Sequence, residues 1–242
     1  MGHIPTEAEL ASLNAKFESA HPVEIIRWAV ETFRPDVALT SSFGADSAAI
    51  IHMALQVDPK ISIRTVDTGF LFPETLQFTE ELRKRFNLNL TVIKTKLSQA
   101  DIDRLKAEHA AGKPIDARYC CDEYKREATE RALKGLTCWI TGLMRVEAKT
   151  RRNTPIVERL ANGLFKVAPI ATWTNKRIYD YMQQHQLPYH PLWHQGYTSI
   201  GCAFHTQKPL DPNDPRSGRW AGTDKTECGI HDIGKPPPHK QS

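Results

Sequence analysis

The sequence has no window that approaches eighteen consecutive apolar residues, and its first residues show neither a basic stretch followed by an apolar run nor a small-residue cleavage site. We therefore expect a cytoplasmic protein with no membrane partner. No basic run with interleaved aromatic side chains occurs, and the net charge of +4 is small for 242 residues. We expect no nucleic-acid partner, whereas an anionic small molecule suits a mildly basic chain.

Cysteine is scarce and odd in number, with five residues in the chain. In a compartment that keeps thiols reduced, such a set is a poor basis for structural disulfides. The cysteines are better explained as core residues, metal ligands or nucleophiles. Cys138 lies inside an apolar run, so packing in the core is its simplest role.

Short apolar runs alternate with helical periodicity along most of the chain, which is 40% hydrophobic and 25% charged. This alternation predicts an α/β fold with a doubly wound, mostly parallel sheet. We expect strands at 37–40, 61–66, 90–94, 138–141 and 164–168. We expect helices at 6–19, 23–32, 47–55, 73–86, 98–110, 122–134 and 175–185.

The chain shows no internal repeat and no linker before about residue 206. We predict one α/β domain over 1–205, with a helical N-terminal region over about 1–34. Residues 206–242 are rich in proline, glycine and charge. Since they bury too little apolar surface to offset their ordering entropy, we predict a flexible, mobile C-terminal tail that carries Cys228.

The stretch "VALTSSFGADSAAIIHMAL" at 37–55 places a turn rich in serine and glycine between a buried strand and an apolar helix. In a doubly wound sheet, backbone N–H groups and a helix N-terminus at such a turn attract phosphate. The candidate contacts are Ser41, Ser42, Gly44, Asp46 and Ser47. An ordinary turn with a serine N-cap has the same pattern.

Two further segments concentrate reactive or charged residues. "TGLMRVEAKTRRNTPIVE" gathers four basic residues within eight positions. Arginine suits multidentate binding of sulfate or phosphate oxygens, although a solvated face has the same composition. "ARYCCDEYKRE" holds the adjacent Cys120 and Cys121. Neighbouring cysteines form no unstrained disulfide with each other, so ligation and packing both remain open.

In their order along the chain, these motifs resemble the assimilatory adenylyl-sulfate and phosphoadenylyl-sulfate reductases of the adenine-nucleotide α-hydrolase (PP-loop) superfamily. The resemblance covers about residues 35–231 and rests also on "VDTGFLFPETLQF", "YTSIGC" and "GRWAGTDKTECGIH". Phe43 stands where ATP-using relatives have the first glycine of Ser-Gly-Gly-x-Asp-Ser, and Met144 where the reductases often have arginine. The substrate-binding residues that the resemblance implies are Ser41, Ser42, Phe43, Gly44, Asp46, Ser47, Asp67, Thr68, Gly69, Lys125, Gly142, Leu143, Arg145 and Arg151.

The resemblance also implies a reaction, the reduction of adenylyl sulfate (APS) or phosphoadenylyl sulfate (PAPS) to sulfite. Cys228 would attack the sulfate sulfur and form an S-sulfocysteine, and thioredoxin or glutaredoxin would then release sulfite. Both steps need a thiolate, which neighbouring cations favour. His231 is predicted to assist Cys228. The choice between APS and PAPS, and a homo-oligomeric state, stay open.

In cluster-bearing reductases, a cysteine pair and a later Cys-x-x-Cys hold a [4Fe-4S] cluster. Here "SIGCAFHT" keeps Cys202 but has His205 in place of the second cysteine. Because histidine ligates iron in Rieske centres, the resemblance implies a [4Fe-4S] cluster on Cys120, Cys121, Cys202 and His205. An empty site is the alternative.

Two other functions fit parts of the sequence. A PP-loop enzyme that cleaves ATP to adenylate RNA or sulfate fits the loop at 41–47 but leaves Cys228 unexplained. A non-catalytic nucleotide or iron–sulfur sensor fits the ligand set in which His205 replaces the fourth cysteine. Pyrophosphate release from ATP distinguishes the first function, and sulfite production with reduced thioredoxin excludes the second.

Overall fold

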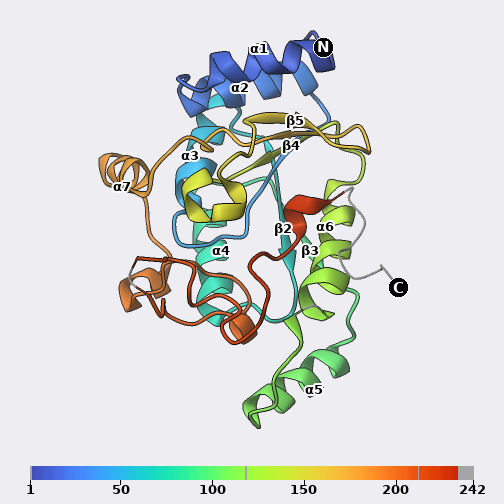
Figure 1. Cartoon of the computed structure of the whole chain (residues 1–242), viewed down its shortest axis with the longest axis vertical. Helices are drawn as coiled ribbons and strands as arrows, with labels where there is room; N and C mark the ends of the chain where they lie inside the picture. The colour runs from blue at the N-terminus through green and yellow to red at the C-terminus, as the bar shows by residue number, and fades with distance from the viewer. Residues whose placement is uncertain (1, 118, 212, 234–242) are drawn as a thin grey trace.

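The computed structural model describes residues 2–117, 119–211 and 213–233. At its centre is a six-stranded sheet in the order β3-β2-β1-β4-β6-β5. Figure 1 shows this sheet with β2, β3, β4 and β5 labelled. The strands are β1 (Val37–Thr40), β2 (Ser62–Asp67), β3 (Leu90–Lys94), β4 (Cys138–Thr141), β5 (Val157–Arg159) and β6 (Phe165–Val167). All neighbouring pairs are parallel except β5 and β6. The predicted mostly parallel sheet is confirmed.

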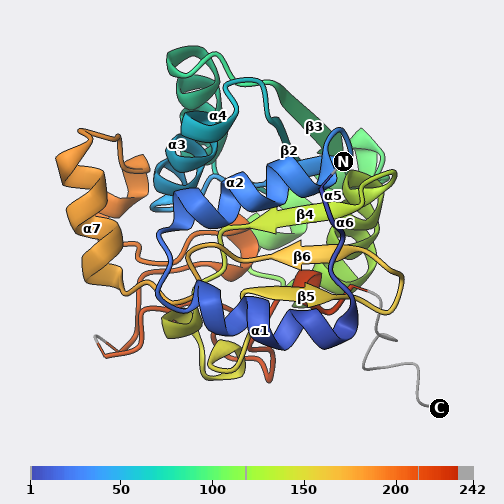
Figure 2. The same cartoon turned by 90° about the horizontal axis from the view of Figure 1, so that it is seen from above.

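Helices cover both faces of this sheet. They are α1 (Glu7–Phe17), α2 (Pro22–Phe33), α3 (Ser47–Val57), α4 (Pro73–Arg85), α5 (Gln99–Ala110), α6 (Arg126–Leu133) and α7 (Asn175–Gln184). Figures 1 and 2 show β2 and β3 between α3 and α4 on one side and α6 on the other. The cause is topological, because the chain runs outward from β1 to β3 and then crosses back to β4 by right-handed connections.

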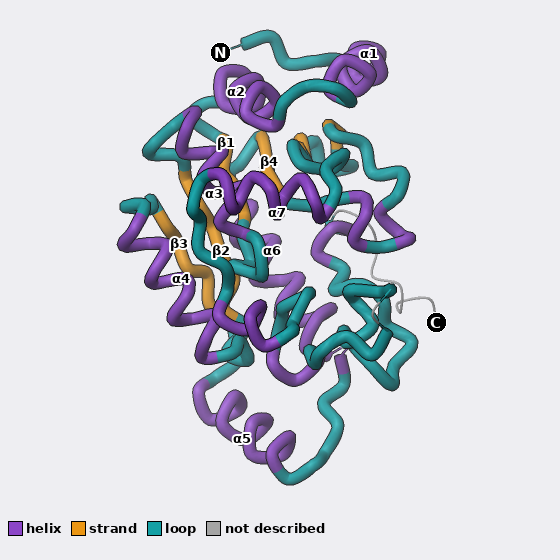
Figure 3. The backbone as a smooth tube through the Cα atoms, turned by 90° about the vertical axis from the view of Figure 1, so that its left-hand side faces the viewer, coloured by secondary structure: helices purple, strands orange, loops and turns teal. Residues whose placement is uncertain are grey.

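The inner strands form the centre of the core. Three of the four residues of β1 and all four of β4 are buried, as expected for parallel strands covered on both faces. Ile26 of α2 and Ile51 and Met53 of α3 are fully buried in the same apolar core. α5 projects beyond the sheet at the end opposite α1 and α2 (Figure 3). In the part of the chain that the structure describes, no helix is both long and apolar enough to cross a membrane.

Two differences separate the predicted elements from the observed ones. The first turns of the helix predicted at 122–134 belong to a π-helix, Tyr119–Lys125, which runs directly into α6. π-Helical turns are rare and occur often at functional sites. The short edge strand β5 was not predicted, although the turn at Asn162 and Gly163 is a strong hairpin signal. The Leu160 N–H donates to the Leu164 carbonyl at 2.8 Å across that turn.

The described part of the C-terminal segment packs on the domain. Trp220, Cys228 and Ile233 are at most 7% exposed. The composition argument underestimated the surface that this segment buries, because a few large side chains account for it. The predicted mobility of 206–242 stays a prediction, and residues 212 and 234–242 lie outside the described residues.

Candidate active site

A cavity of about 260 Å³ lies at the carboxyl ends of β1 and β4. These neighbouring strands connect to helices on opposite faces, since β1 leads to α3 and β4 follows α6. The crevice at such a switch point is the usual ligand site of a doubly wound sheet. Gly142 and Leu143, both predicted site residues, line the cavity after β4. The C-terminal segment adds Cys228 and His231 to the wall.

The loop after β1 forms another part of the wall. The predicted residues of this loop that line the cavity are Ser41, Ser42, Gly44, Asp46 and Ser47. The N-cap of α3 is Asp46, which makes no side-chain capping hydrogen bond. The loop is therefore not the ordinary serine-capped turn that the sequence left open. Its contacts with a substrate stay a prediction.

Phe43 has an unusual backbone conformation within this loop. Its φ of 49° lies in the left-handed region that favours glycine. The Phe43 N–H donates to the Ser41 Oγ at 3.1 Å. A left-handed conformation costs a non-glycine residue about 1–2 kcal/mol. The ring is fully buried in the main core, and this burial offsets the cost.

Four cationic side chains line the cavity and outnumber its two carboxylates, Asp46 and Glu147, among the described lining residues. The four are Lys125, Arg151, Arg216 and Arg219. Burial and the neighbouring Glu147 charge raise the pKa of Asp46 to about 6. The excess of positive charge suits a ligand with several anionic groups.

Arg216 and Arg219 were missed by the sequence reasoning. Their signal is "PRSGRW", two arginines and a tryptophan in a segment otherwise typical of a loop. Gly201 makes room for Arg219, because a Cβ at Gly201 would lie 2.3 Å from the Arg219 Nη2. The guanidinium lies over the Trp220 ring, 4.4 Å from its centroid, a cation–π contact. Arg219 is thereby held against the cavity wall.

Cys228 is 7% exposed and lines the cavity. Directly after it, Gly229 adopts a φ of 73° and turns the chain into a short helix, Ile230–Asp232. The negative charge that Cys228 carries when it is ionised raises the pKa of Lys125 above its ordinary value, against the opposing effect of burial. A thiolate beside a fixed ammonium group is the arrangement that a nucleophilic cysteine needs.

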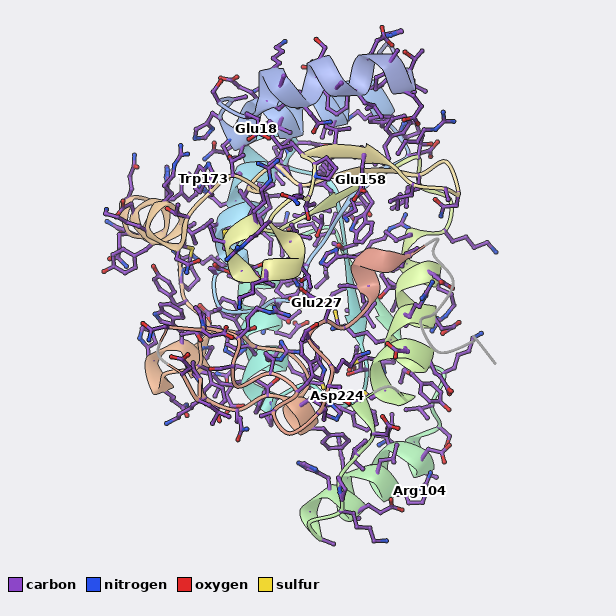
Figure 4. All side chains as sticks on the ribbon, viewed as in Figure 1. Glu18, Arg104, Glu158, Trp173, Asp224 and Glu227 are labelled. Carbon is purple, nitrogen blue, oxygen red and sulfur yellow. The ribbon has the colours of Figure 1, made fainter. Side chains whose placement is uncertain are left out.

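Glu227 anchors the chain next to Cys228. Its carboxylate accepts two hydrogen bonds of 2.7 Å from Arg151 and one of 3.1 Å from Arg216. Burial alone would raise the pKa of Glu227, but the hydrogen bonds and charges of the two arginines outweigh it and lower the pKa. Arg151 is 9% exposed and also pairs with Glu147. Figure 4 labels Glu227 near the middle of the molecule.

His231 lines the cavity and packs against the sheet. Its ring stacks on Trp139, with centroids 5.7 Å apart and planes 9° apart. The Nδ1 atom is buried and has no hydrogen-bond partner among the described residues. Burial and the positive charge of Arg151 hold the pKa of His231 well below its ordinary value. The imidazole is therefore neutral, and its predicted assistance to Cys228 stays a prediction.

Arg145 is not among the described residues that line the cavity, and its predicted contact with a substrate stays a prediction. Its guanidinium donates hydrogen bonds of 2.9 and 2.7 Å to Glu18, the residue that follows α1, and one of 2.8 Å to the Thr154 carbonyl. Figure 4 labels Glu18 in the upper part of the molecule, apart from Glu227. In this structure, Arg145 joins the N-terminal helices to the domain.

The last residue of β2 and the segment after it lie beside the cysteines. Three predicted contacts from this segment are missing from the described residues that line the cavity: Asp67, Thr68 and Gly69. The next residue, Phe70, packs with Cys120 and Cys202 in one apolar cluster. Its carbonyl accepts a 2.7 Å hydrogen bond from the Ala203 N–H. The segment thus supports the Cys202 loop, and its contact with a substrate stays a prediction.

A compact group of thiol and imidazole side chains lies beside the cavity. The ligand atoms of Cys120, Cys202 and His205 all lie within 4.8 Å of one another, and all three residues are buried. The Cys202 Sγ lies 3.3 Å from the His205 Nδ1. This donor set suits a thiophilic metal ion. Cys121, the fourth predicted ligand, is outside this group of described residues. Its thiol contacts the Cys120 thiol, and it also packs with Trp220 and Cys228.

Residues 36–208 match a sequence model of the phosphoadenosine phosphosulfate reductase domain. A phosphoadenosine 5'-phosphosulfate reductase of Synechocystis sp. is 37% identical over 236 residues, which cover 96% of this chain and 94% of the relative. A protein of the same name from Xanthomonas oryzae pv. oryzae is 40% identical over 235 residues, with 93% of each chain covered.

The fold is similar to that of a solved phosphoadenylyl-sulfate (PAPS) reductase from Candida auris in a phosphate complex. The TM-score is 0.71 at 23% identity, and the match covers 86% of this chain and 100% of that one. The family model, which matches most of the chain, and the relatives at 37% and 40% identity name the same family. The observed fold agrees with them. The chain belongs to the phosphoadenosine phosphosulfate reductase family.

Proposed function

We propose that this chain reduces PAPS to sulfite, with thioredoxin or glutaredoxin as the electron donor. The observation that carries the proposal is Cys228, a buried thiol at a cavity lined by four cationic side chains. The family and the names of the relatives support the reaction. The cationic cavity favours PAPS over APS, because the 3′-phosphate adds negative charge to the ligand.

In the proposed complex, the nucleotide lies over the loop at 41–47. The sulfate lies near Lys125 and Arg219, which line the cavity together with Cys228. Arg145, implied by the resemblance for this role, is engaged by Glu18. Fixed cations that face the reacting sulfate reduce its repulsion of an approaching thiolate.

The first step is nucleophilic substitution at sulfur. The Cys228 thiolate attacks the sulfate sulfur, a sulfur–sulfur bond forms and the bond from sulfur to the phosphate oxygen breaks. Adenosine 3′,5′-bisphosphate leaves with the electron pair of the broken bond. Lys125 and Arg219 neutralise charge on the sulfate oxygens during this step. The product on the enzyme is S-sulfocysteine.

The second step returns Cys228 to the thiol. A donor thiolate attacks the Cys228 sulfur, and sulfite leaves with the electrons of the sulfur–sulfur bond. The second donor thiol then displaces Cys228 from the mixed disulfide. In the balance, the donor dithiol becomes a disulfide and the transferred sulfur is reduced by two electrons.

The second step also requires movement. At 7% exposure, the Cys228 sulfur is closed to a protein partner. The proposal therefore includes release of the segment 206–233 from the cavity after the first step. The contacts of Glu227 with Arg151 and Arg216 are the ones that open.

No step is assigned to the [4Fe-4S] cluster that the resemblance implies. Such a cluster needs four ligands, each on a different iron atom. The donor atoms of Cys120, Cys202 and His205 converge instead within 4.8 Å. The Cys121 thiol contacts only the Cys120 side of this group and packs with Trp220 and Cys228. The donor arrangement does not fit the cluster.

The proposed location is the cytoplasm. The five cysteines are free thiols, which agrees with a compartment that keeps thiols reduced. The same compartment supplies the reduced dithiol donor that the reaction consumes.

Turnover tests the proposal. The purified protein is incubated with PAPS or APS and reduced thioredoxin, and sulfite is measured. We expect sulfite from PAPS, with a kcat/KM at least about 10-fold above that for APS. Pyrophosphate release from ATP would support the adenylating function instead, and no sulfite from either substrate would support a sensor.

A further inference from the structure

We propose that Cys120, Cys202 and His205 bind a single divalent metal ion of the zinc type, in place of an iron–sulfur cluster. The site lies beside the active-site cavity, and no step of the proposed reaction uses it. The inference therefore stands apart from the proposed function.

The compactness of the donor group carries this inference. Its two sulfur atoms and one imidazole nitrogen all lie within 4.8 Å of one another. Around one zinc ion with Zn–S bonds of about 2.3 Å, tetrahedral geometry places two ligand sulfurs about 3.8 Å apart. In a cubane cluster, each ligand binds a different iron atom, so the ligands are separated by the width of the cluster. The observed donors converge on one centre.

His205 is oriented as a metal ligand. Its Nε2 lies 2.8 Å from the carbonyl oxygen of Ile115. An Nε2–H that donates to this carbonyl leaves the Nδ1 lone pair directed at Cys202, 3.3 Å away. Metal-binding histidines almost always use their second nitrogen in this way. The carbonyl therefore selects the tautomer that a metal ion needs.

The surroundings of the thiols are mainly apolar, with Arg219 as a charged neighbour of Cys202. Cys120 and Cys202 pack with Phe70, Ile102 and Leu105 in one cluster. Thiolates are costly in such surroundings unless positive charge compensates them. A divalent ion provides that charge, and soft thiolates with an imidazole are donors that zinc prefers.

The ion would connect two segments that shape the cavity. Cys120 belongs to the π-helix that ends at Lys125. His205 ends a short helix, and its carbonyl accepts hydrogen bonds from the Trp220 N–H at 3.0 Å and from Arg219 Nε at 3.4 Å. A metal ion bound by both segments would fix Lys125 through the π-helix and Arg219 through the His205 carbonyl.

Metal titration tests the proposal. Protein cleared of metal with a chelator is titrated with Zn²⁺, and with Co²⁺ as a spectroscopic substitute. We expect one equivalent per chain and thiolate-to-cobalt charge-transfer bands. Zn²⁺ should also raise the Tm of the wild-type protein, because the ion binds only the folded state.

Variants identify the ligands. Cys120→Ser, Cys202→Ser and His205→Ala should each weaken Zn²⁺ binding at least about 10-fold. Cys121→Ser and the core control Cys138→Ala should keep the wild-type affinity. Acid-labile sulfide in the purified protein, loss of binding in Cys121→Ser, or no saturable binding to the wild-type protein would each overturn the proposal. The wild-type titration decides the matter even where a ligand variant does not fold.

Discussion

The thiol of Cys228 and the thiols of Cys120 and Cys202 lie in neighbouring parts of this chain, but different side chains surround them. Cys228 is 7% exposed and Cys202 is 6% exposed, so burial does not distinguish them. Cys228 lines a cavity with Lys125 and Arg219. Cys202 also interacts with Arg219, but its sulfur lies 3.3 Å from the His205 Nδ1 and it packs against Phe70. A thiol among fixed cations is suited to nucleophilic attack, and a thiol that converges with another thiol and an imidazole is suited to metal binding. The neighbours of a cysteine decide its chemistry here.

The largest expected effect is that of Cys228→Ser. A serine hydroxyl is far less ionised than a thiol, so sulfite release should fall at least about 1,000-fold. Binding of adenosine 3′,5′-bisphosphate, measured by calorimetry, should be unchanged. Cys138→Ala removes a buried thiol of β4 outside the cavity and should keep its turnover. Full turnover by Cys228→Ser would show that Cys228 is not the nucleophile, and so would contradict its distinction from the metal-binding thiols.

Glu227→Gln tests how Cys228 is held among the cations. The substitution removes the charge that accepts hydrogen bonds from Arg151 and Arg216. A loss of about 1.4–2.7 kcal/mol, typical of charged hydrogen bonds, should lower kcat/KM about 10- to 100-fold.

The matched control for this prediction is Glu18→Gln. Glu18 also forms a two-bond pair with an arginine, Arg145, but away from the cavity. It should leave kcat/KM close to that of the wild type. An equal loss of kcat/KM in Glu227→Gln and Glu18→Gln would contradict a specific role of Glu227 in holding Cys228.

Gly201→Ala tests the position of Arg219. The new Cβ, 2.3 Å from Nη2, forces the guanidinium away from Trp220. Loss of one charge-assisted contact should raise KM about 10-fold, with little change in Tm because only the flexible end of the side chain moves. The double variant with Arg219→Ala should be no worse than Arg219→Ala alone. Additive losses would contradict this account.

Asp46 is an anionic exception in the cationic cavity, and its effect should be the smallest. Its folded-state pKa of about 6 lies above the ordinary 3.8. Its stabilising contribution is therefore complete below about pH 4 and is lost as the pH rises through 6. The unfolding free energy of the wild type should decrease between pH 4 and pH 8. In Asp46→Asn this decrease should be smaller by about 1–2 kcal/mol. Urea unfolding at both pH values measures this, and an unchanged fall would count against the raised pKa.

Most of the fold could be predicted because apolar periodicity is strong in a sheet covered on both faces. β1, β3 and β4 agree with the prediction residue for residue. The π-helix before α6 could not be separated from an α-helix, because seven residues are too few to distinguish the two helical periods. β5 is only three residues long, and its signal lay in the turn that follows it.

The site was less predictable because it depends on distant contacts. The loop at 41–47 and Cys228, which lie at the cavity, could be predicted because each belongs to a short local motif. Arg145 matches a motif as well, but its partner Glu18 is 127 positions away in the sequence. Arg219 reaches the cavity wall beside Gly201, a contact between two loops. Neither pairing is visible in sequence spacing.

The most direct test is to mix the protein with PAPS in the absence of an electron donor and to measure its mass, intact and after proteolysis. The account predicts one added SO₃ group, located on Cys228, that reduced thioredoxin releases as sulfite. Release of the nucleotide without an adduct, or an adduct on Cys120, Cys121 or Cys202, would contradict it.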